Sequence, residues 1–160
     1  MSDTKTLYEN DFVAWSKEQA EALRAEARAG SNQKLDWENL AEEIESLGIS
    51  EKRELRSQIQ RIIHHLLKLE HSTAAEPRRS WDESIGHARS EIELLLKDSP
   101  SLVRDVQSMI TDEFARGSRK ALRDLEKYGE LDPAVKARFR SAPYTTEQIL
   151  GDWFPPELKA

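Results

Sequence analysis

The chain has 160 residues and a formal net charge of −6, and 38% of its residues are hydrophobic and 34% charged. This length suits one domain with its own core, spanning residues 1–160, and the acidic balance disfavours nucleic acid as a partner. The absence of cysteine excludes disulfides, thiolate metal sites and cysteine nucleophiles. With no signal-peptide pattern and no apolar run of about 20 residues, we expect a cytoplasmic protein that does not enter a membrane.

The N-terminal part of the chain predicts a short tail and two helices. Residues 1–6 lack an apolar pattern and are expected to form a loose tail. Apolar residues at helical spacing then predict a helix from Phe12 that ends before Gly30, a residue suited to a helix C-terminus. Asp36 is a good N-cap for a second helix, and Gly48 is expected to end that helix and form a corner.

Residues 51–73 predict the central helix, because they have the densest apolar side in the chain. The apolar residues that share this side are Leu55, Ile59, Ile62, Ile63, Leu66, Leu67 and Leu69. We therefore expect the other helices to pack against this segment and to bury those side chains.

Polar and proline residues divide the C-terminal half of the chain. Ser80 is a suitable N-cap for a fourth helix, and Ser99 followed by Pro100 starts a fifth that runs to about Lys127. An Asp-Pro pair at 132–133 starts a shorter helical piece that ends near residue 141. The predicted architecture is all-α, a bundle-like domain of about five helices with a short C-terminal helical segment.

The C-terminal segment, residues 142–160, combines aromatic residues with turn signals. Thr145 and Gln148 fit a capping box, which predicts one turn of helix. Trp153 and Phe154 then precede a pair of prolines, and they are candidates for docking a partner. Because so much apolar area cannot form a core by itself, we expect this segment to pack back on the bundle, with Trp153 against the first or second helix.

Residues 36–48 form a long and specific motif, Asp-Trp-Glu-Asn-Leu-Ala-Glu-Glu-Ile-Glu-Ser-Leu-Gly. Shorter motifs follow in order at residues 65–68, 80–81, 100–102 and 144–155. The order of these motifs resembles a known bacterial family, which is called domain of unknown function twenty-nine. The resemblance covers about Leu7 to Pro156 and implies a small helical protein of cyanobacteria and proteobacteria that usually forms the entire chain. It implies no activity, and Leu69 stands where relatives often have Trp.

The histidines give little support for a metal site, and we expect neither a metal nor a cofactor. No two histidines have the i, i+4 spacing that places two ligands on one side of a helix. His87 and Glu91 have this spacing and could supply two ligands, but such pairs are common in a Glu-rich chain.

Four polar residues flank or enter the apolar sides of different helices, namely Glu43, His65, Arg89 and Glu113. They could converge in a polar pocket inside the bundle, with Arg89 pairing with Glu113. An interior ion pair is the favoured interpretation, because a buried charge needs a partner. A catalytic or metal-binding site is the alternative.

The remaining candidates are surfaces. The predicted fifth helix has a basic run that consists of Arg116, Arg119, Lys120 and Arg123. Without interleaved aromatic residues and a basic overall charge, this run favours a solvated helix side over a weak nucleic-acid binder. The sequence therefore favours a non-enzymatic interaction or regulatory module, with a protein or a second copy as partner. An enzyme or metal-binding protein that uses the polar cluster is the alternative, and nucleic-acid binding comes third.

Overall fold

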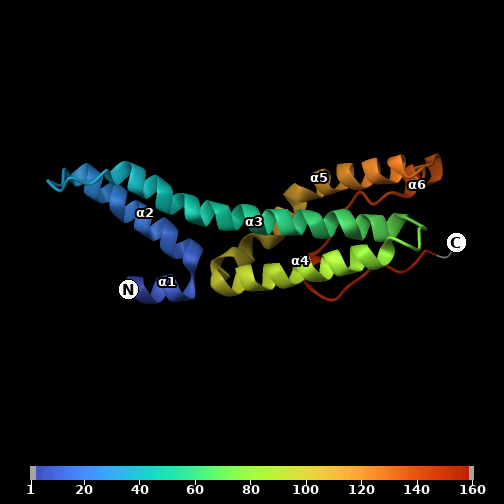
Figure 1. The fold of residues 1–160 in the computed structure, drawn as a ribbon, viewed down its shortest axis with the longest axis horizontal. Helices are drawn as coiled ribbons and strands as arrows, with labels where there is room; N and C mark the ends of the chain where they lie inside the picture. The colour runs from blue at the N-terminus through green and yellow to red at the C-terminus, as the bar shows by residue number, and fades with distance from the viewer. Residues whose placement is uncertain (1–2, 159–160) are drawn as a thin grey trace. The chain divides into compact units, whose positions relative to one another are not determined.

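The computed structural model describes residues 3–158, which form α-helices and one 3-10 helix with no strand (Figure 1). The helices are α1 (Thr4–Asn10), α2 (Phe12–Ala29), α3 (Trp37–His71), α4 (Arg78–Asp98), η1 (Pro100–Asp105, the 3-10 helix), α5 (Val106–Lys127), α6 (Pro133–Arg138) and α7 (Thr146–Leu150). The predicted all-α class is confirmed. The chain divides into two compact units, unit 1 with residues up to 55 and 94–104, and unit 2 with residues 56–93 and from 105 onward.

Helix α3 is a single continuous helix where the sequence predicted two helices and a corner at Gly48. The prediction of a corner was wrong, because Gly48 serves close packing and does not end a helix. A Cβ atom built at Gly48 would collide with the hydroxyl oxygen of Ser16 on α2. Ser16 and Ala20 of α2 are buried with Ala41 and Gly48 of α3, so small residues line the seam between these helices in unit 1.

The N-terminus is more ordered than the sequence indicated. Residues 4–6, expected in a loose tail, begin α1, and Asp3 caps that helix by accepting a hydrogen bond from the Lys5 amide. Residues 1 and 2 lie outside the described residues. Asp11 caps α2 through the Ala14 amide and also accepts hydrogen bonds from the amide and hydroxyl of Ser101 in η1. Gly30 ends α2 in the left-handed conformation, as predicted.

Unit 2 contains the main hydrophobic core. The residues of α3 that were predicted to be central, from Ile59 to Leu67 along the apolar side, have no exposed surface. They pack with buried residues of α4 and α5, among them Trp81, Ile85, Ile92, Val106, Ile110, Phe114 and Leu125. Gly117 allows α5 to approach α3 closely, since a Cβ there would meet the side chain of Ile63.

The C-terminal segment lies within unit 2, where Tyr144 and Ile149 are buried. Tyr144 donates its hydroxyl proton to Glu70 at 2.7 Å, and its burial raises the pKa of the phenol. The predicted capping box forms between Thr145 and Gln148. Trp153 is half-buried beside Tyr144, with 5.9 Å between the ring centroids, and its carbonyl accepts a hydrogen bond from Arg89 of α4. The sequence had instead predicted a contact with the first or second helix.

Candidate functional site

The four residues of the predicted polar cluster make separate sets of contacts. Glu43 is exposed on α3 in unit 1, whereas His65, Arg89 and Glu113 belong to unit 2. The predicted ion pair between Arg89 and Glu113 does not form, because both side chains bond to other groups among the described residues. Helical spacing predicts on which side of a helix a residue lies. It does not predict how neighbouring helices are shifted along their axes, which decides which side chains meet.

Arg89 anchors the C-terminal segment. Its guanidinium donates hydrogen bonds to the carbonyls of Gln148, Ile149 and Trp153, at 2.8, 2.9 and 2.7 Å. It also lies 4.8 Å from the ring centroid of Phe154, whose side chain is 40% exposed. Trp153 and Phe154, predicted as a docking pair, are therefore held by contacts within unit 2.

Glu113 is a buried carboxylate on α5 that is satisfied by its surroundings. Gln60 donates a 2.9 Å hydrogen bond to one carboxylate oxygen, and Arg56 and Arg116 lie 3.5 and 3.4 Å from the other. Gln60 in turn accepts a hydrogen bond from Lys120. The partners of this buried carboxylate are therefore Gln60, Arg56 and Arg116, and not the Arg89 side chain that the sequence predicted.

His65 is half-buried on α3 and stacks on His64, with 4.9 Å between the ring centroids. Its Nδ1 atom has no hydrogen-bond partner among the described residues. Burial lowers the pKa of His65 to about 4, with further lowering from His64, Lys68 and Arg61. At neutral pH the ring is therefore uncharged.

A second polar network links α3 to α5. His64 Nε2 lies 2.7 Å from Asp124 Oδ2, and Lys68 donates a 3.1 Å hydrogen bond to the same oxygen. Burial alone would raise the pKa of Asp124, but the hydrogen bonds from His64 and Lys68 outweigh it and lower the pKa. Burial also lowers the pKa of His64. In the sequence, the i, i+4 spacing of His64 and Lys68 indicates that both side chains lie on the same side of α3 and can reach one partner.

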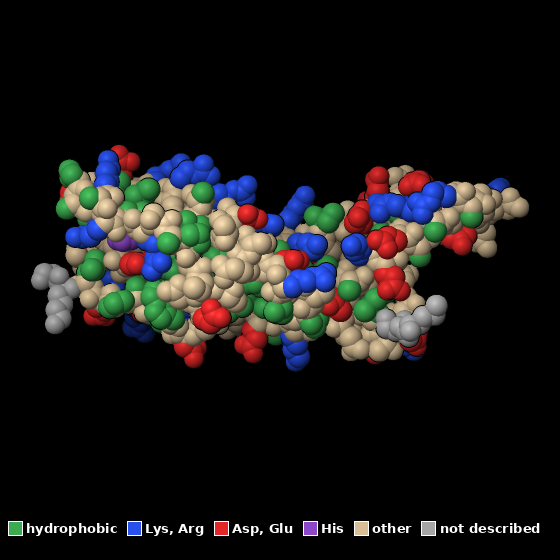
Figure 2. All heavy atoms as spheres, turned by 180° about the vertical axis from the view of Figure 1, so that it is seen from behind, with side chains coloured by type: hydrophobic (Ala, Val, Ile, Leu, Met, Phe, Trp, Pro, Cys, Tyr) green, Lys and Arg blue, Asp and Glu red, His purple; other side chains and the backbone are tan. Residues whose placement is uncertain are grey.

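No group of three or more His, Asp or Glu side chains within residues 3–158 is placed to hold a metal ion. Lys and Arg side chains gather along the edge where α5 and α6 lie (Figure 2), but Arg116 and Lys120 contact Glu113 and Gln60. None of the helices in this range has the length and hydropathy needed to cross a membrane.

Unit 1 exposes a row of apolar side chains on α1, α2 and α3. On α3, Leu40 and Leu47 are 39% and 48% exposed, and Ile44 between them is half-buried. Their spacing of four and three residues puts them on one side of the helix, next to the seam of small residues. Because the seam is narrow, these larger side chains remain outside it.

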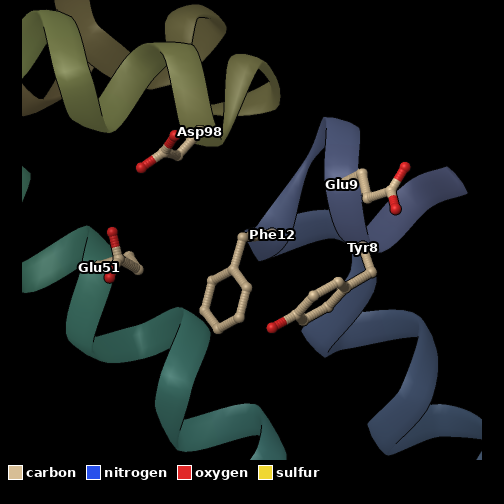
Figure 3. Close-up of a pocket in the computed structure, with 5 residues that line it drawn as sticks. All are labelled: Tyr8, Glu9, Phe12, Glu51 and Asp98. Atoms are coloured by element: carbon tan, nitrogen blue, oxygen red, sulfur yellow. The ribbon is translucent and has the colours of Figure 1, made fainter. Parts of the chain in front are cut away.

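An aromatic cluster continues this row. The ring of Tyr8, which is 53% exposed, lies 6.1 Å from Phe12 and 4.8 Å from Trp15 between centroids. Figure 3 shows Tyr8 and Phe12 facing the pocket beside Glu51 of α3. Glu51 follows Leu47 by one helical turn, so it lies on the same side of α3 as the row.

This pocket has a volume of about 300 Å³ and an acidic lining that includes Glu9, Glu51 and Asp98 (Figure 3). No Lys, Arg or His among the described residues forms a salt bridge with any of these three carboxylates. Burial, with repulsion from Asp98 and Glu54, raises the pKa of Glu51. We call this surface the hydrophobic–acidic face, and its residues are Tyr8, Glu9, Phe12, Trp15, Leu40, Ile44, Leu47, Glu51 and Asp98.

The fold and the sequence of this chain are similar to those of known proteins. A crystal structure of an alpha-helical protein of unknown function from Rhodospirillum rubrum is similar to this chain, with a TM-score of 0.73 and 27% identity. The similarity covers 91% of this chain and 89% of that one. No curated protein matches significantly. The profile of the family described as "Domain of unknown function DUF29" matches residues 7–154, so this chain belongs to that family.

Proposed function

We propose that this chain is a non-enzymatic interaction module of the cytoplasm, whose hydrophobic–acidic face binds a basic amphipathic helix of a partner protein. The observation that carries the proposal is the row of exposed apolar side chains, Leu40 and Leu47, on the same side of α3 as Glu51 of the acidic pocket in unit 1. Exposed apolar rows next to charged residues are typical of surfaces that bind other proteins.

The apolar residues suit the side of a helix. Leu40, Ile44 and Leu47 follow one side of α3 over two turns. Phe12 of α2 lines the pocket with Glu51, one turn beyond Leu47, so the aromatic residues lie at one end of this row. A partner helix with apolar residues at the same spacing could lie along this row.

The carboxylates favour a basic partner over a second copy of this chain. Glu9, Glu51 and Asp98 have no salt-bridge partner among the described residues, and repulsion contributes to the raised pKa of Glu51. A lysine or arginine would relieve that repulsion, and its stem could lie on the rings of Tyr8 and Phe12. A second copy would instead bring two acidic faces together on chains of charge −6.

Calorimetric titration of the full chain tests this proposal with a helical peptide of about 20 residues, leucine on one side and lysine elsewhere. We expect saturable binding that the double variant Leu40→Ala/Leu47→Ala weakens by about tenfold or more. Ile49→Ala is the matched control, because Ile49 is exposed on the opposite side of α3. Equal affinities of the double variant and the control would overturn the proposal.

The charge contribution is tested separately. Glu51→Gln/Asp98→Asn should weaken binding and flatten its salt dependence, whereas Glu42→Gln, exposed on the other side of α3, should do neither. Sedimentation of the chain alone measures its oligomeric state and tests the alternative that the face binds a second copy of this chain. A dimer that Leu40→Ala/Leu47→Ala converts to monomer would assign the face to a second copy and reject the basic partner.

A further inference from the structure

Unit 2 contains a second cavity, separate from the hydrophobic–acidic face. Its volume is about 380 Å³, within the range of small-molecule sites. The side chains that line it come from α3, the connection to α4, α4 itself and the turn after α5, namely Lys68, Ala74, Pro77, Trp81, Tyr128 and Glu130.

Lys68 supplies a buried cation to this cavity. The residue is 7% exposed, and its ammonium lies 4.7 Å from the ring centroid of Trp81. Its only hydrogen-bond acceptor among the described residues is Asp124, at 3.1 Å. Since an ammonium has three donors, Lys68 retains hydrogen-bonding capacity for a bound anion.

Glu130 supplies an anion to the same cavity. Its Oε2 atom accepts hydrogen bonds from the hydroxyl of Ser72 and the amide of Thr73, and its Oε1 atom has no donor among the described residues. Ser72 follows Lys68 by one helical turn, and its amide bonds to the Lys68 carbonyl. The contact with Ser72 therefore puts the Glu130 carboxylate about one turn, roughly 5 Å, along the helix from Lys68.

The rest of the lining is apolar. The indole of Trp81, the ring of Tyr128 and the side chains of Ala74 and Pro77 surround the two charged groups. We propose that this cavity binds a small zwitterion with an aromatic body, of the chemical class of the aromatic amino acids. Lys68 binds the carboxylate, Glu130 binds the ammonium, and the ring lies against Trp81 and Tyr128.

Equilibrium titration of the full chain tests this site, with L-phenylalanine, L-tyrosine and L-tryptophan as probes. We expect saturable binding of at least one of them. Phenylacetate lacks the ammonium and phenethylamine lacks the carboxylate, so both should bind about tenfold or more weakly than phenylalanine. No saturable binding of the three amino acids up to about 10 mM would overturn the proposal. So would binding of phenylacetate or phenethylamine that is as tight as that of phenylalanine.

Three variants and one control assign the contacts. Lys68→Met and Glu130→Gln should each weaken binding by about tenfold or more, whereas Lys52→Met, at an exposed position on α3, should leave it unchanged. Because Lys68 is buried, Tyr128→Ala provides a variant at a side chain that is 65% exposed. Tyr128→Ala should weaken binding severalfold without changing the circular dichroism spectrum, and unchanged affinity in that variant would reject the site.

Discussion

Gly48 of α3 faces Ser16 of α2 so closely that a Cβ atom at Gly48 would collide with the serine hydroxyl oxygen. That hydroxyl donates a 2.9 Å hydrogen bond to the carbonyl of Val13. The pair keeps α2 and α3 close together through small residues. The larger apolar residues Leu40 and Leu47 are consequently left on the surface, where they form part of the hydrophobic–acidic face.

Gly48→Ala should destabilise the protein by about 1–3 kcal/mol, although alanine is the better helix former, because overpacking outweighs propensity at this seam. Gly86→Ala is the matched control, since nothing lies within 4 Å of a Cβ at Gly86 in α4. It should stabilise the protein by about 0.5–1 kcal/mol. Urea denaturation measures both, and adding Ser16→Ala to Gly48→Ala should recover most of the loss. A stabilising Gly48→Ala would contradict the close packing.

The sequence correctly predicted the C-terminal half of α3 as a helix, but it wrongly predicted that a helix ends at Gly48, in what is the middle of α3. The apolar residues from Leu55 to Leu67 occur at helical spacing over more than three turns, a pattern that only a helix with one buried side satisfies. A glycine, in contrast, is compatible with a helix end and with a close helix contact. Only the position of Ser16 on another helix distinguishes the two cases at Gly48.

The contacts of the candidate site residues were also not predictable from the sequence, because they depend on the positions of residues on other helices. The burial of Glu113 was readable from its place on an apolar side, but its partners Gln60 and Arg56 depend on the relative height of α3 and α5. The exposure of Leu40 and Leu47 was not predictable from the sequence either. A helical wheel marks both as core residues, and they lie outside the core because the seam holds only small side chains.

Leu66→Ala should lower the free energy of unfolding by about 2–5 kcal/mol, because Leu66 has no exposed surface in the core of unit 2. Chemical denaturation followed by circular dichroism measures the loss. Leu94→Ala, at a side chain that is 56% exposed, should change the stability far less. Similar denaturation midpoints for wild type and Leu66→Ala would reject the central position of α3.

Arg89→Met should release the C-terminal segment, because three carbonyl groups of residues 148–153 lose their donor together. Limited proteolysis should then cut between residues 142 and 158 in the variant and not in the wild type. Arg79→Met removes an exposed arginine of the same helix and is the control. Resistance of Arg89→Met to cleavage would show that the segment is held by its apolar contacts alone.

Stability should fall as the pH is lowered from about 6.5 to about 4, with His65 as a contributor. The folded state holds the pKa of His65 at about 4, below its value in the unfolded chain. Between these values the unfolded state binds more protons, so acid favours unfolding. His65→Gln should reduce this pH dependence, and His87→Gln, at an exposed position, is the control. Urea midpoints at several pH values measure the effect, and identical profiles for His65→Gln and wild type would exclude it.

The proposed interaction face is tested most directly by nuclear magnetic resonance of the full chain, titrated with the basic amphipathic peptide. The account predicts that amide signals of residues 8–23 and 40–51 shift in a saturable way. These shifts should disappear in Leu40→Ala/Leu47→Ala and persist in Ile49→Ala. Shifts confined to unit 2, or spread evenly over both units and unchanged in the double variant, would contradict the account.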